Sequence, residues 1–166
     1  AVVAGRGMRP RGHWGGKGVE IGRLTEADLP ALAGLYKQFW GEDSCLEKMR
    51  ATFRRLKERP DYIFLAAKDN GRLVGSVLGI VCEELYGECV PFMVVEDVIV
   101  DAEWRRKGIG SALMSELERL ATELNCGHVI FVTEGERTDA QRFYESLGYR
   151  PDAYRGFKKR LRKPNS

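Results

Sequence analysis

Hydrophobic positions in the first third of the chain repeat with helical spacing. Between residues 29 and 39 they recur three or four apart, and a second set does the same between 46 and 56. Thr25 precedes the first set as a candidate N-cap, and Pro60 follows the second set, where proline cannot continue a helix. The pattern therefore predicts two helices, preceded by a short strand over residues 19–23.

The middle of the chain changes to β-rich runs. Residues 62–68 and 73–81 flank the turn Asp69-Asn70-Gly71, and its Asn-Gly step suits the positive φ of a tight hairpin turn. A further β-rich run covers residues 90–100. These runs predict an antiparallel hairpin followed by another strand.

The last third combines both patterns. An apolar stripe over residues 109–124 indicates a long amphipathic helix, and residues 128–133 indicate a strand. The capping-box pattern Thr138-Asp139-Ala140-Gln141 opens a further helix, which Gly148 ends. Residues 149–161 alternate well enough for one or two closing strands.

This order of helices and strands is typical of an α/β (mixed α+β) fold. We expect a central mixed sheet of six or seven strands flanked by about four helices. Residues 1–18 contain six glycines and no acidic residue, so we expect a flexible N-terminal extension there. The remainder, residues 19–166, is expected to be a single domain, and no apolar stretch approaches the length of about 20 residues that a membrane span needs.

The formal net charge of +3 conceals an uneven distribution. Residues 19–149 carry 16 Lys and Arg against 23 Asp and Glu, whereas both ends of the chain are basic. An acidic body does not favour nucleic acid as a partner, and no series of base-stacking aromatic residues accompanies the cations. The basic ends are therefore interpreted as solvated tails or as electrostatic docking segments.

The cysteines do not indicate a metal site. They form no C-x-x-C pair and have no nearby His that would complete a zinc site: Cys45, Cys82, Cys89 and Cys126. We expect buried free thiols and no metal. The N-terminus lacks the pattern of a secretory signal, and we expect a cytoplasmic protein.

The segment after residue 100 combines three features of an anion-binding loop. A strand ends, the cations Arg105, Arg106 and Lys107 follow, and Gly108 and Gly110 then open a helix. The first amides of a helix have no partner inside it, and the helix dipole favours negative charge. The spacing matches neither the P-loop nor the dinucleotide fingerprint. The segment predicts a site for another phosphate ligand, and the alternative is a basic turn whose glycines only start and pack the helix.

Two ordered motifs resemble the GNAT family of N-acetyltransferases. Arg105-x-x-Gly108-x-Gly110 is similar to the family's R/Q-x-x-G-x-G/A pyrophosphate loop, and Ala140-x-x-Phe143-Tyr144-x-x-x-Gly148-Tyr149 is similar to its second signature. The strong resemblance covers about residues 62–161. It implies a GNAT-type acyl-CoA N-acyltransferase fold and the transfer of an acetyl group from acetyl-CoA to an amine.

The resemblance also implies roles for individual residues. The main chain of Val98, Ile99 and Val100 would bind the pantetheine arm like an added strand, and Tyr144 would protonate the departing thiolate. The pyrophosphate would be held by Arg105, Arg106, Lys107, Gly108, Ile109, Gly110 and Ser111. Arg137 stands where many members of the family have Asn, so no contact is assigned to it.

An amine with a pKa of about 10 is mostly protonated at neutral pH, so acyl transfer needs a base. Glu96 is the candidate, because it lies on the strand that leads to the pantetheine-binding main chain. The Glu96-Asp97 pair resembles that of glucosamine-phosphate and aminoalkylphosphonate acetyltransferases. Strand alternation places the two side chains on opposite faces, so one of them would point to the acceptor. The alternative is that both are sheet-edge or ion-pairing residues.

Seven acidic residues and no Lys or Arg lie between Glu83 and Glu103. An acidic strip would steer cationic amines toward the site, so we expect a small-molecule, polyamine-like primary amine as acceptor. A solvated loop face explains the strip equally well. A protein or peptide acceptor and a non-catalytic acyl-CoA sensor stay open as alternatives, and a homodimer stays open as the assembly.

Overall fold

A computed structural model describes residues 18–161 of the chain. These residues form two compact units, 18–130 and 131–161, and each is described by itself. The expected flexible extension, residues 1–18, lies outside the described residues except for Gly18. The expectation of a single domain over residues 19–166 stays a prediction.

The N-terminal unit is built on a five-stranded sheet in which the order of the strands follows the order of the chain. Its strands are β1 Val19–Arg23, β2 Tyr62–Asp69, β3 Arg72–Cys82, β4 Phe92–Val100 and β5 Val129–Ile130. β1 to β4 pair antiparallel, and β5 runs parallel to β4. The predicted hairpin is confirmed: β2 and β3 are joined by Asn70 and Gly71, with φ values of 46° and 83°.

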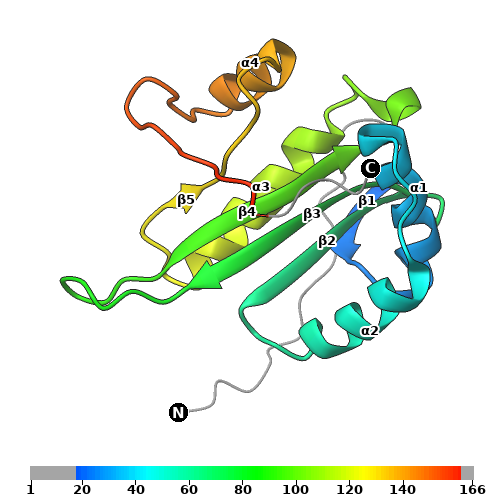
Figure 1. The fold of residues 1–166 in the computed structure, drawn as a ribbon, viewed down its shortest axis with the longest axis horizontal. Coiled ribbons are helices and arrows are strands. Elements are labelled where there is room, and N and C mark those ends of the chain that lie inside the picture. Colours follow the sequence, from blue (N-terminus) through cyan, green and yellow to red (C-terminus); the bar gives the residue numbers. More distant parts are fainter. Residues whose placement is uncertain (1–17, 162–166) are drawn as a thin grey trace. The chain divides into compact units, whose positions relative to one another are not determined.

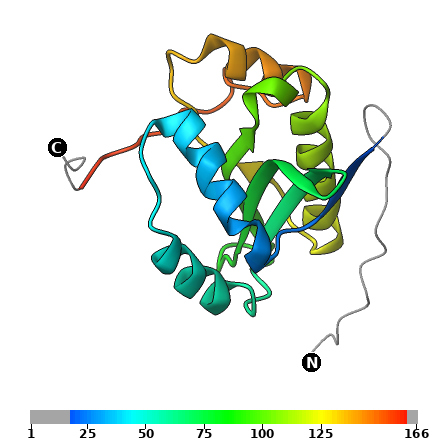
Figure 2. The same ribbon diagram turned by 90° about the vertical axis from the view of Figure 1, so that its right-hand side faces the viewer.

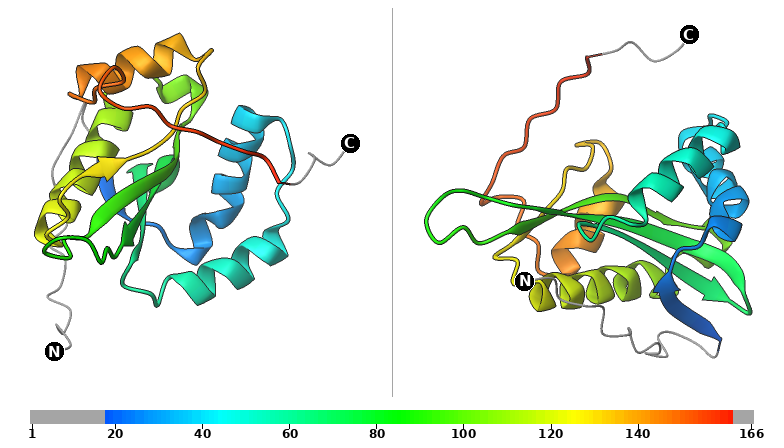
Figure 3. Two further views of the ribbon diagram at one scale, coloured as in Figure 1. Left: turned by 60° about the vertical axis from the view of Figure 1, so that its left-hand side comes forward. Right: turned by 90° about the horizontal axis from the view of Figure 1, so that it is seen from below.

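Helices cover both faces of this sheet (Figure 1). α1 Leu29–Trp40 and α2 Leu46–Leu56 lie on one face, and α3 Ile109–Glu123 lies on the other, as Figure 2 and the right panel of Figure 3 show. The three predicted helices are therefore confirmed. Thr25 begins a short 3-10 helix, Glu26–Asp28, that leads directly into α1.

Each face of the sheet has its own core. Beneath α1 and α2, Phe53 of α2 clusters with aliphatic side chains from α1, from three strands and from the segment after β1: Leu24, Leu29, Leu32, Leu35, Ala66, Leu73 and Ile99. On the other face, α3 packs so close to β3 that a Cβ on Gly79 would stand only 2.6 Å from Leu117 Cδ1. The apolar stripe of α3 is buried as predicted up to Leu120, whereas Leu124 is 42% exposed at the end of the helix.

The C-terminal unit contains α4 Thr138–Ser146. Gly148, with φ 91°, ends this helix as predicted. The predicted capping box is wrong, because Arg137 is the N-cap and Thr138 is already the first helical residue. Gln141 donates instead to the carbonyl oxygen of Gly135 (2.8 Å).

The mixed α/β fold with four helices is confirmed, but the sheet has five strands, fewer than the six or seven expected. Residues 149–161 form no strand, and the strand expected over 128–133 shortens to the two residues of β5. An alternating segment becomes a strand only where its backbone groups pair with a neighbour. Pro151 has no amide hydrogen to donate, and the cations Arg155 and Lys158 are exposed.

No helix within residues 18–161 is long and apolar enough to cross a membrane. In the same part of the chain, no group of three or more His, Cys, Asp or Glu side chains is placed to hold a metal ion. The four cysteines are free as expected, but the expected burial is wrong for Cys45 and Cys89, which are exposed.

Candidate active site

β4 contains a β-bulge in its second half. Leu78 of β3 pairs with Glu96 and Ser76 pairs with Ile99, so β4 has one residue more than β3 between these two pairs. Asp97 lies in this extra segment with φ 54°, in the left-handed region. A bulge of this kind interrupts the ladder and changes the direction of side chains.

The bulge brings Glu96 and Asp97 to the same side of the sheet. Glu96 stands directly opposite Leu78, which pairs with Phe64, and Phe64 packs against the core beneath α1 and α2. Directly opposed residues share a face. The Asp97 Oδ2 accepts a long hydrogen bond of 3.4 Å from the Tyr36 hydroxyl of α1. The predicted alternation is therefore wrong here, because both carboxylates lie on the α1 side.

The two carboxylates differ in their surroundings. Glu96 is exposed, whereas Asp97 is half-buried. Burial raises the pKa of Asp97 above the ordinary value for Asp, and the hydrogen bond from Tyr36 offsets part of this rise. Burial, together with the neighbouring Asp97, also raises the pKa of Tyr36, so its phenol stays neutral and donates the hydrogen bond.

The outer edge of β4 is left without a strand beyond its first half. β5 pairs only with Met93 and Val94, so residues 95–100 have no strand partner on that edge within residues 18–130. The predicted pantetheine-binding residues Val98, Ile99 and Val100 lie in this stretch. An extended ligand arm can therefore lie along it as an added strand would.

The chain leaves β4 through a tight connection to α3. A short 3-10 helix, Ala102–Trp104, follows the buried Asp101, whose Oδ1 accepts from the amide of Glu103 (3.0 Å). Arg106 and Gly108 then adopt left-handed φ values of 59° and 80°. These two residues turn the backbone into the helix.

α3 begins without a side-chain cap. Gly108 is its N-cap, and the first helical hydrogen bond joins the amide of Ala112 to the carbonyl oxygen of Gly108 (2.9 Å). The amides of Ile109, Gly110 and Ser111 precede this bond and have no partner inside the helix. A Cβ on Gly108 would meet no atom within 4 Å, so the space beside it is open.

Three exposed cations stand immediately before this helix. Arg105 Nε donates to the carbonyl oxygen of Val100 (3.3 Å), and Lys107 Nζ lies 4.6 Å from the centre of the Trp104 ring. Arg106 lies between them. Uncapped amides, an open space and adjacent cations fit a bound pyrophosphate.

Tyr144 lies in the C-terminal unit, whereas the other predicted site residues lie in the N-terminal unit. Tyr144 lies in α4, and its ring packs against the rings of Phe131 and Phe143, with centroid distances of 4.3 Å and 5.0 Å. Burial raises the pKa of Tyr144, and Arg137 acts in the opposite direction. The phenol is therefore protonated at neutral pH.

The predicted acidic strip is not one surface. Asp101 is 3% exposed and forms an ion pair with Arg72 (3.1 Å), so it serves the fold. Glu83 and Glu88 lie in the β3–β4 loop, whereas Glu96 lies about 13 Å further along β4 than its first residue. Of the seven acidic residues, Glu96 and Asp97 form the pair on the α1 side of β4.

The sequence interpretation missed Tyr36 and Trp40 of α1. Both fall on the apolar spacing of the helix and therefore resembled core residues. Tyr36 packs against the core beneath α1 and also contacts Asp97 through its hydroxyl, whereas Trp40 is 51% exposed. A clue was available in the adjacent Glu42 and Asp43, because the core face of a helix seldom continues into an acidic loop.

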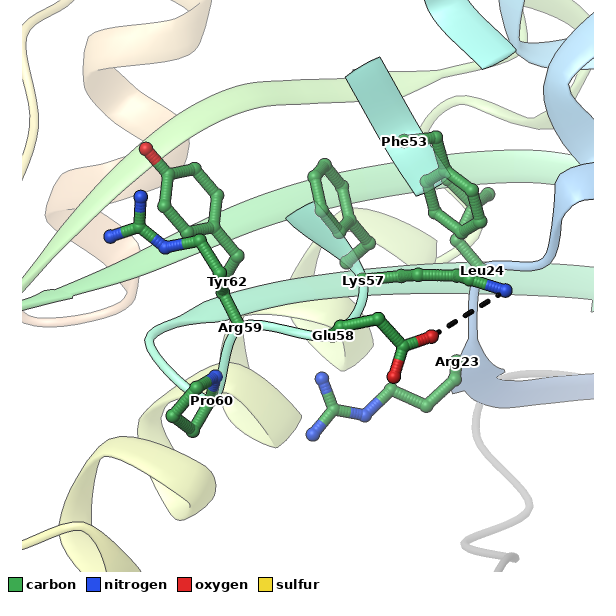
Figure 4. Close-up of a pocket in the computed structure, with 9 residues that line it drawn as sticks. Arg23, Leu24, Phe53, Lys57, Glu58, Arg59, Pro60 and Tyr62 are labelled. Atoms are coloured by element: carbon green, nitrogen blue, oxygen red, sulfur yellow. Dashed lines mark ion pairs between the residues drawn. The ribbon is translucent and has the colours of Figure 1, made fainter. Parts of the chain in front are cut away.

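A shallow cavity of about 340 Å³ lies elsewhere in the N-terminal unit. Residues of β1, α2 and β2 line it, and Figure 4 shows the ion pair of Lys57 with Glu58 (3.6 Å) at its rim. Another lining cation, Arg59, pairs with Asp61 (2.5 Å). β1 and β2 lie toward one edge of the sheet, whereas β4 and β5 lie toward the other edge. This cavity is therefore separate from the candidate site.

Comparison with known proteins agrees with the motifs. The model of the acetyltransferase (GNAT) family matches residues 29–149. A curated relative is the N-acetyltransferase YhfO of Bacillus subtilis (strain 168), itself uncharacterised. It is 24% identical over 143 residues, which cover 81% of this chain and 91% of YhfO.

Solved structures share the fold. A candidate acetyltransferase from Agrobacterium tumefaciens str. C58 superposes with a TM-score of 0.79 at 24% identity, covering 85% of this chain and 99% of that one. Glucosamine-6-phosphate N-acetyltransferase from Arabidopsis thaliana gives a TM-score of 0.75 at 19% identity, covering 85% of this chain and 97% of that one. The expected GNAT-type fold is therefore confirmed.

Proposed function

Because this chain belongs to the GNAT family of acetyltransferases and is thus an acyltransferase, we propose that it transfers an acetyl group from acetyl-CoA to a primary amine of a small molecule. One observation carries the proposal: the edge of β4 that has no strand partner within residues 18–130 is followed directly along the chain by the uncapped start of α3. The strand edge suits an extended arm and the helix start suits a pyrophosphate. Coenzyme A contains these two parts next to each other.

Residues of the N-terminal unit would hold the donor. The main chain of Val98, Ile99 and Val100 binds the pantetheine arm. The amides and cations of the loop bind the pyrophosphate: Arg105, Arg106, Lys107, Gly108, Ile109, Gly110 and Ser111. When bound, acetyl-CoA supplies an activated acetyl group, whose carbonyl carbon forms an amide bond with the amine as its bond to sulfur breaks.

Two side chains manage the protons. Glu96 accepts a proton from the amine, directly or through water, because it lies exposed on the strand that would carry the pantetheine arm. Tyr144 protonates the departing thiolate. A phenol is a workable donor to a thiolate whose conjugate acid has a pKa of about 8.5.

A small-molecule acceptor is supported by one solved relative of the same fold, which is named for glucosamine 6-phosphate. A protein or peptide acceptor is the nearest alternative, and a non-catalytic acyl-CoA sensor is the second. No metal takes part in the proposed reaction. A cytoplasmic location, a homodimer and the absence of a nucleic-acid partner stay predictions.

Release of free thiol from acetyl-CoA tests the proposal. The panel comprises simple amines, amino sugars, aminophosphonates and lysine-containing peptides. Thiol release that depends on a small amine supports the proposal. Release with peptides alone favours the protein acceptor, and stabilisation by acetyl-CoA without release on any amine favours the sensor.

A further inference from the structure

Two aromatic residues of α1 and one carboxylate of β4 are linked by contacts through Tyr36. Tyr36 and Trp40 are one helical turn apart in α1, with ring centroids 5.1 Å from each other. The Tyr36 hydroxyl donates to Asp97 Oδ2 (3.4 Å). Tyr36 thus contacts both other residues, and we refer to the three as the Trp40–Asp97 cluster.

The indole of Trp40 is both held in place and open to solvent. Phe39 packs against it with a centroid distance of 5.0 Å, and Tyr36 packs against it as well. Even so, Trp40 is 51% exposed. Trp provides the strongest cation–π face among the aromatic residues, so an exposed indole that is held by Tyr36, which also contacts the carboxylate of Asp97, suits a cation.

Asp97 is the member of the cluster whose charge lacks a counterion. Two other buried carboxylates of the same unit are paired: Asp28 with Lys68 (2.7 Å) and Asp101 with Arg72 (3.1 Å). Asp97 is half-buried, yet no Lys or Arg forms an ion pair with it within residues 18–161. A half-buried carboxylate without a counterion is costly, and a bound cation removes that cost.

We propose that the Trp40–Asp97 cluster binds a second ammonium group of the acceptor, so that the enzyme selects diamines over monoamines. This inference rests on the proposed acetyl transfer. The cluster holds the second ammonium and not the reacting one, because a partly buried carboxylate would raise the pKa of the ammonium it binds and oppose deprotonation. Glu96, exposed on the same side of β4, accepts the proton of the reacting amine.

Three acceptors with the same four-carbon chain test the proposal. They are 1,4-diaminobutane, butylamine and 4-aminobutyrate, which end in an ammonium, a methyl and a carboxylate group. We expect kcat/KM for the diamine to exceed that for butylamine at least tenfold, with 4-aminobutyrate the poorest acceptor. In Asp97→Asn we expect the ratio of kcat/KM for the diamine to kcat/KM for butylamine to fall to about two or less. The main cause is a rise in the KM for the diamine.

Variants of Trp40 test the aromatic part of the cluster. We expect Trp40→Leu to lower the ratio of diamine to butylamine roughly three- to fivefold, and Trp40→Phe to keep most of it. The matched controls lie in the β3–β4 loop: Glu88→Gln removes an exposed carboxylate, and Tyr86→Leu removes a ring that is 83% exposed. Both controls leave the ratio unchanged.

Two kinetic outcomes overturn the inference: a wild-type ratio near one, or an equal loss of kcat/KM on all three acceptors in Asp97→Asn.

Binding of the amines provides a test that does not need turnover. Tryptophan fluorescence is expected to report tighter binding of 1,4-diaminobutane than of butylamine, with the signal lost in Trp40→Phe. If neither these three amines nor the broader acceptor panel releases thiol, the proposed function fails. The cluster then stands or falls on this binding difference, and equal binding of the two amines overturns it.

Discussion

At the scale of single residues, function and fold use the same side-chain types in different surroundings. Asp28 and Asp101 are buried carboxylates that pair with Lys68 and Arg72, and both hold the backbone together. Asp97 is a half-buried carboxylate that meets a phenol and no cation in the described part of the chain. The carboxylates of Asp28 and Asp101, which have a cation as partner, therefore have a structural role. The carboxylate of Asp97, which has none within residues 18–161, can accept a cationic ligand.

Replacement of Tyr144 by Phe tests the proposed acid. We expect Tyr144→Phe to lower kcat by about 100-fold, because general acid catalysis typically contributes 100-fold or more. The dissociation constant of acetyl-CoA should change by less than about twofold. Because burial raises the pKa of Tyr144, the wild-type rate should not fall until the pH exceeds the ordinary range of a tyrosine.

Turnover and acetyl-CoA binding are measured separately for this variant and for Tyr154→Phe. Tyr154 is 86% exposed and serves as the matched control. An unchanged kcat in Tyr144→Phe on a good acceptor would remove Tyr144 from the reaction.

Replacement of Asp28 by Asn tests a structural carboxylate. Asp28 accepts hydrogen bonds from the Thr25 amide (2.8 Å) and hydroxyl (2.7 Å) and pairs with Lys68. Burial acts to raise the pKa of Asp28, but the hydrogen bonds from Lys68 and Thr25 outweigh it and lower the pKa overall. We expect Asp28→Asn to reduce the free energy of unfolding by roughly 1–3 kcal/mol at pH 7.

The effect of Asp28 has a defined pH dependence. Because the folded-state pKa is lowered, the stabilisation is present above the ordinary pKa of Asp, about 3.9, and is lost as the pH falls through the folded-state value. Urea unfolding at pH 7 and pH 3 measures this. Asp43→Asn, which breaks the exposed pair with Lys37 (2.8 Å), is the control and should cost less than about 1 kcal/mol. A cost for Asp28→Asn that is the same at both pH values contradicts the prediction.

At the scale of elements, β4 determines the geometry of the site. Its first half pairs on both edges, whereas its second half has β3 on one edge and no strand on the other within residues 18–130. The bulge at Asp97 lies within this second half, directly before Val98, Ile99 and Val100. The residues proposed to bind the donor therefore follow the bulge, and their outer edge has no strand partner within residues 18–130.

Close approach of α3 to the sheet gives a prediction at this scale. A Cβ on Gly79 would stand 2.6 Å from Leu117 Cδ1 and 3.0 Å from Met93 Sδ. We expect Gly79→Ala to lower the free energy of unfolding by about 1–3 kcal/mol, because the buried side chain of Leu117, or the helix that carries it, must shift to admit the methyl group. Gly22→Ala is the control, since a Cβ there meets no atom within 4 Å. Equal effects of the two substitutions in urea unfolding would contradict the packing argument.

At the scale of the whole molecule, charge is distributed unevenly along the chain. The net charge of +3 combines an acidic segment, residues 19–149, with two basic ends. Within that segment, the cations Arg105, Arg106 and Lys107 are consecutive and stand before the uncapped start of α3. The carboxylates Glu96 and Asp97 lie on the preceding strand, so positive and negative charge are separated along a few residues of backbone.

Stabilisation of the protein by acetyl-CoA tests whether the cations before α3 or the overall charge of the protein bind the donor. Acetyl-CoA at 100 times its Kd should stabilise the wild-type protein by about 2.7 kcal/mol, which raises Tm by roughly 5–10 °C. We expect the triple substitution Arg105→Ala, Arg106→Ala and Lys107→Ala to lose most of this shift. The control removes as much charge from the C-terminal segment: Arg155→Ala, Lys158→Ala and Lys159→Ala. Equal losses in both variants would show that net charge and not the loop binds the donor.

Features that depend on local spacing could be predicted from the amino-acid sequence. The helices α1 to α3, the Asn70-Gly71 hairpin and the glycine loop before α3 could all be predicted, because cap, turn and periodicity signals act within a few residues. The two motifs were sufficient for the family. Residues 149–161 alternate as a strand does but form none, because a strand also requires a neighbour with which its backbone groups can pair.

Only the tertiary structure decided which residues meet. The bulge at Asp97 depends on the register with β3, and it reversed the expected separation of Glu96 and Asp97. Tyr36 reaches Asp97 across 61 residues of sequence, a contact that no local pattern encodes. Local spacing fixes the conformation of a segment, whereas the packing of α1 against β4 fixes which carboxylate faces an aromatic surface and which faces solvent.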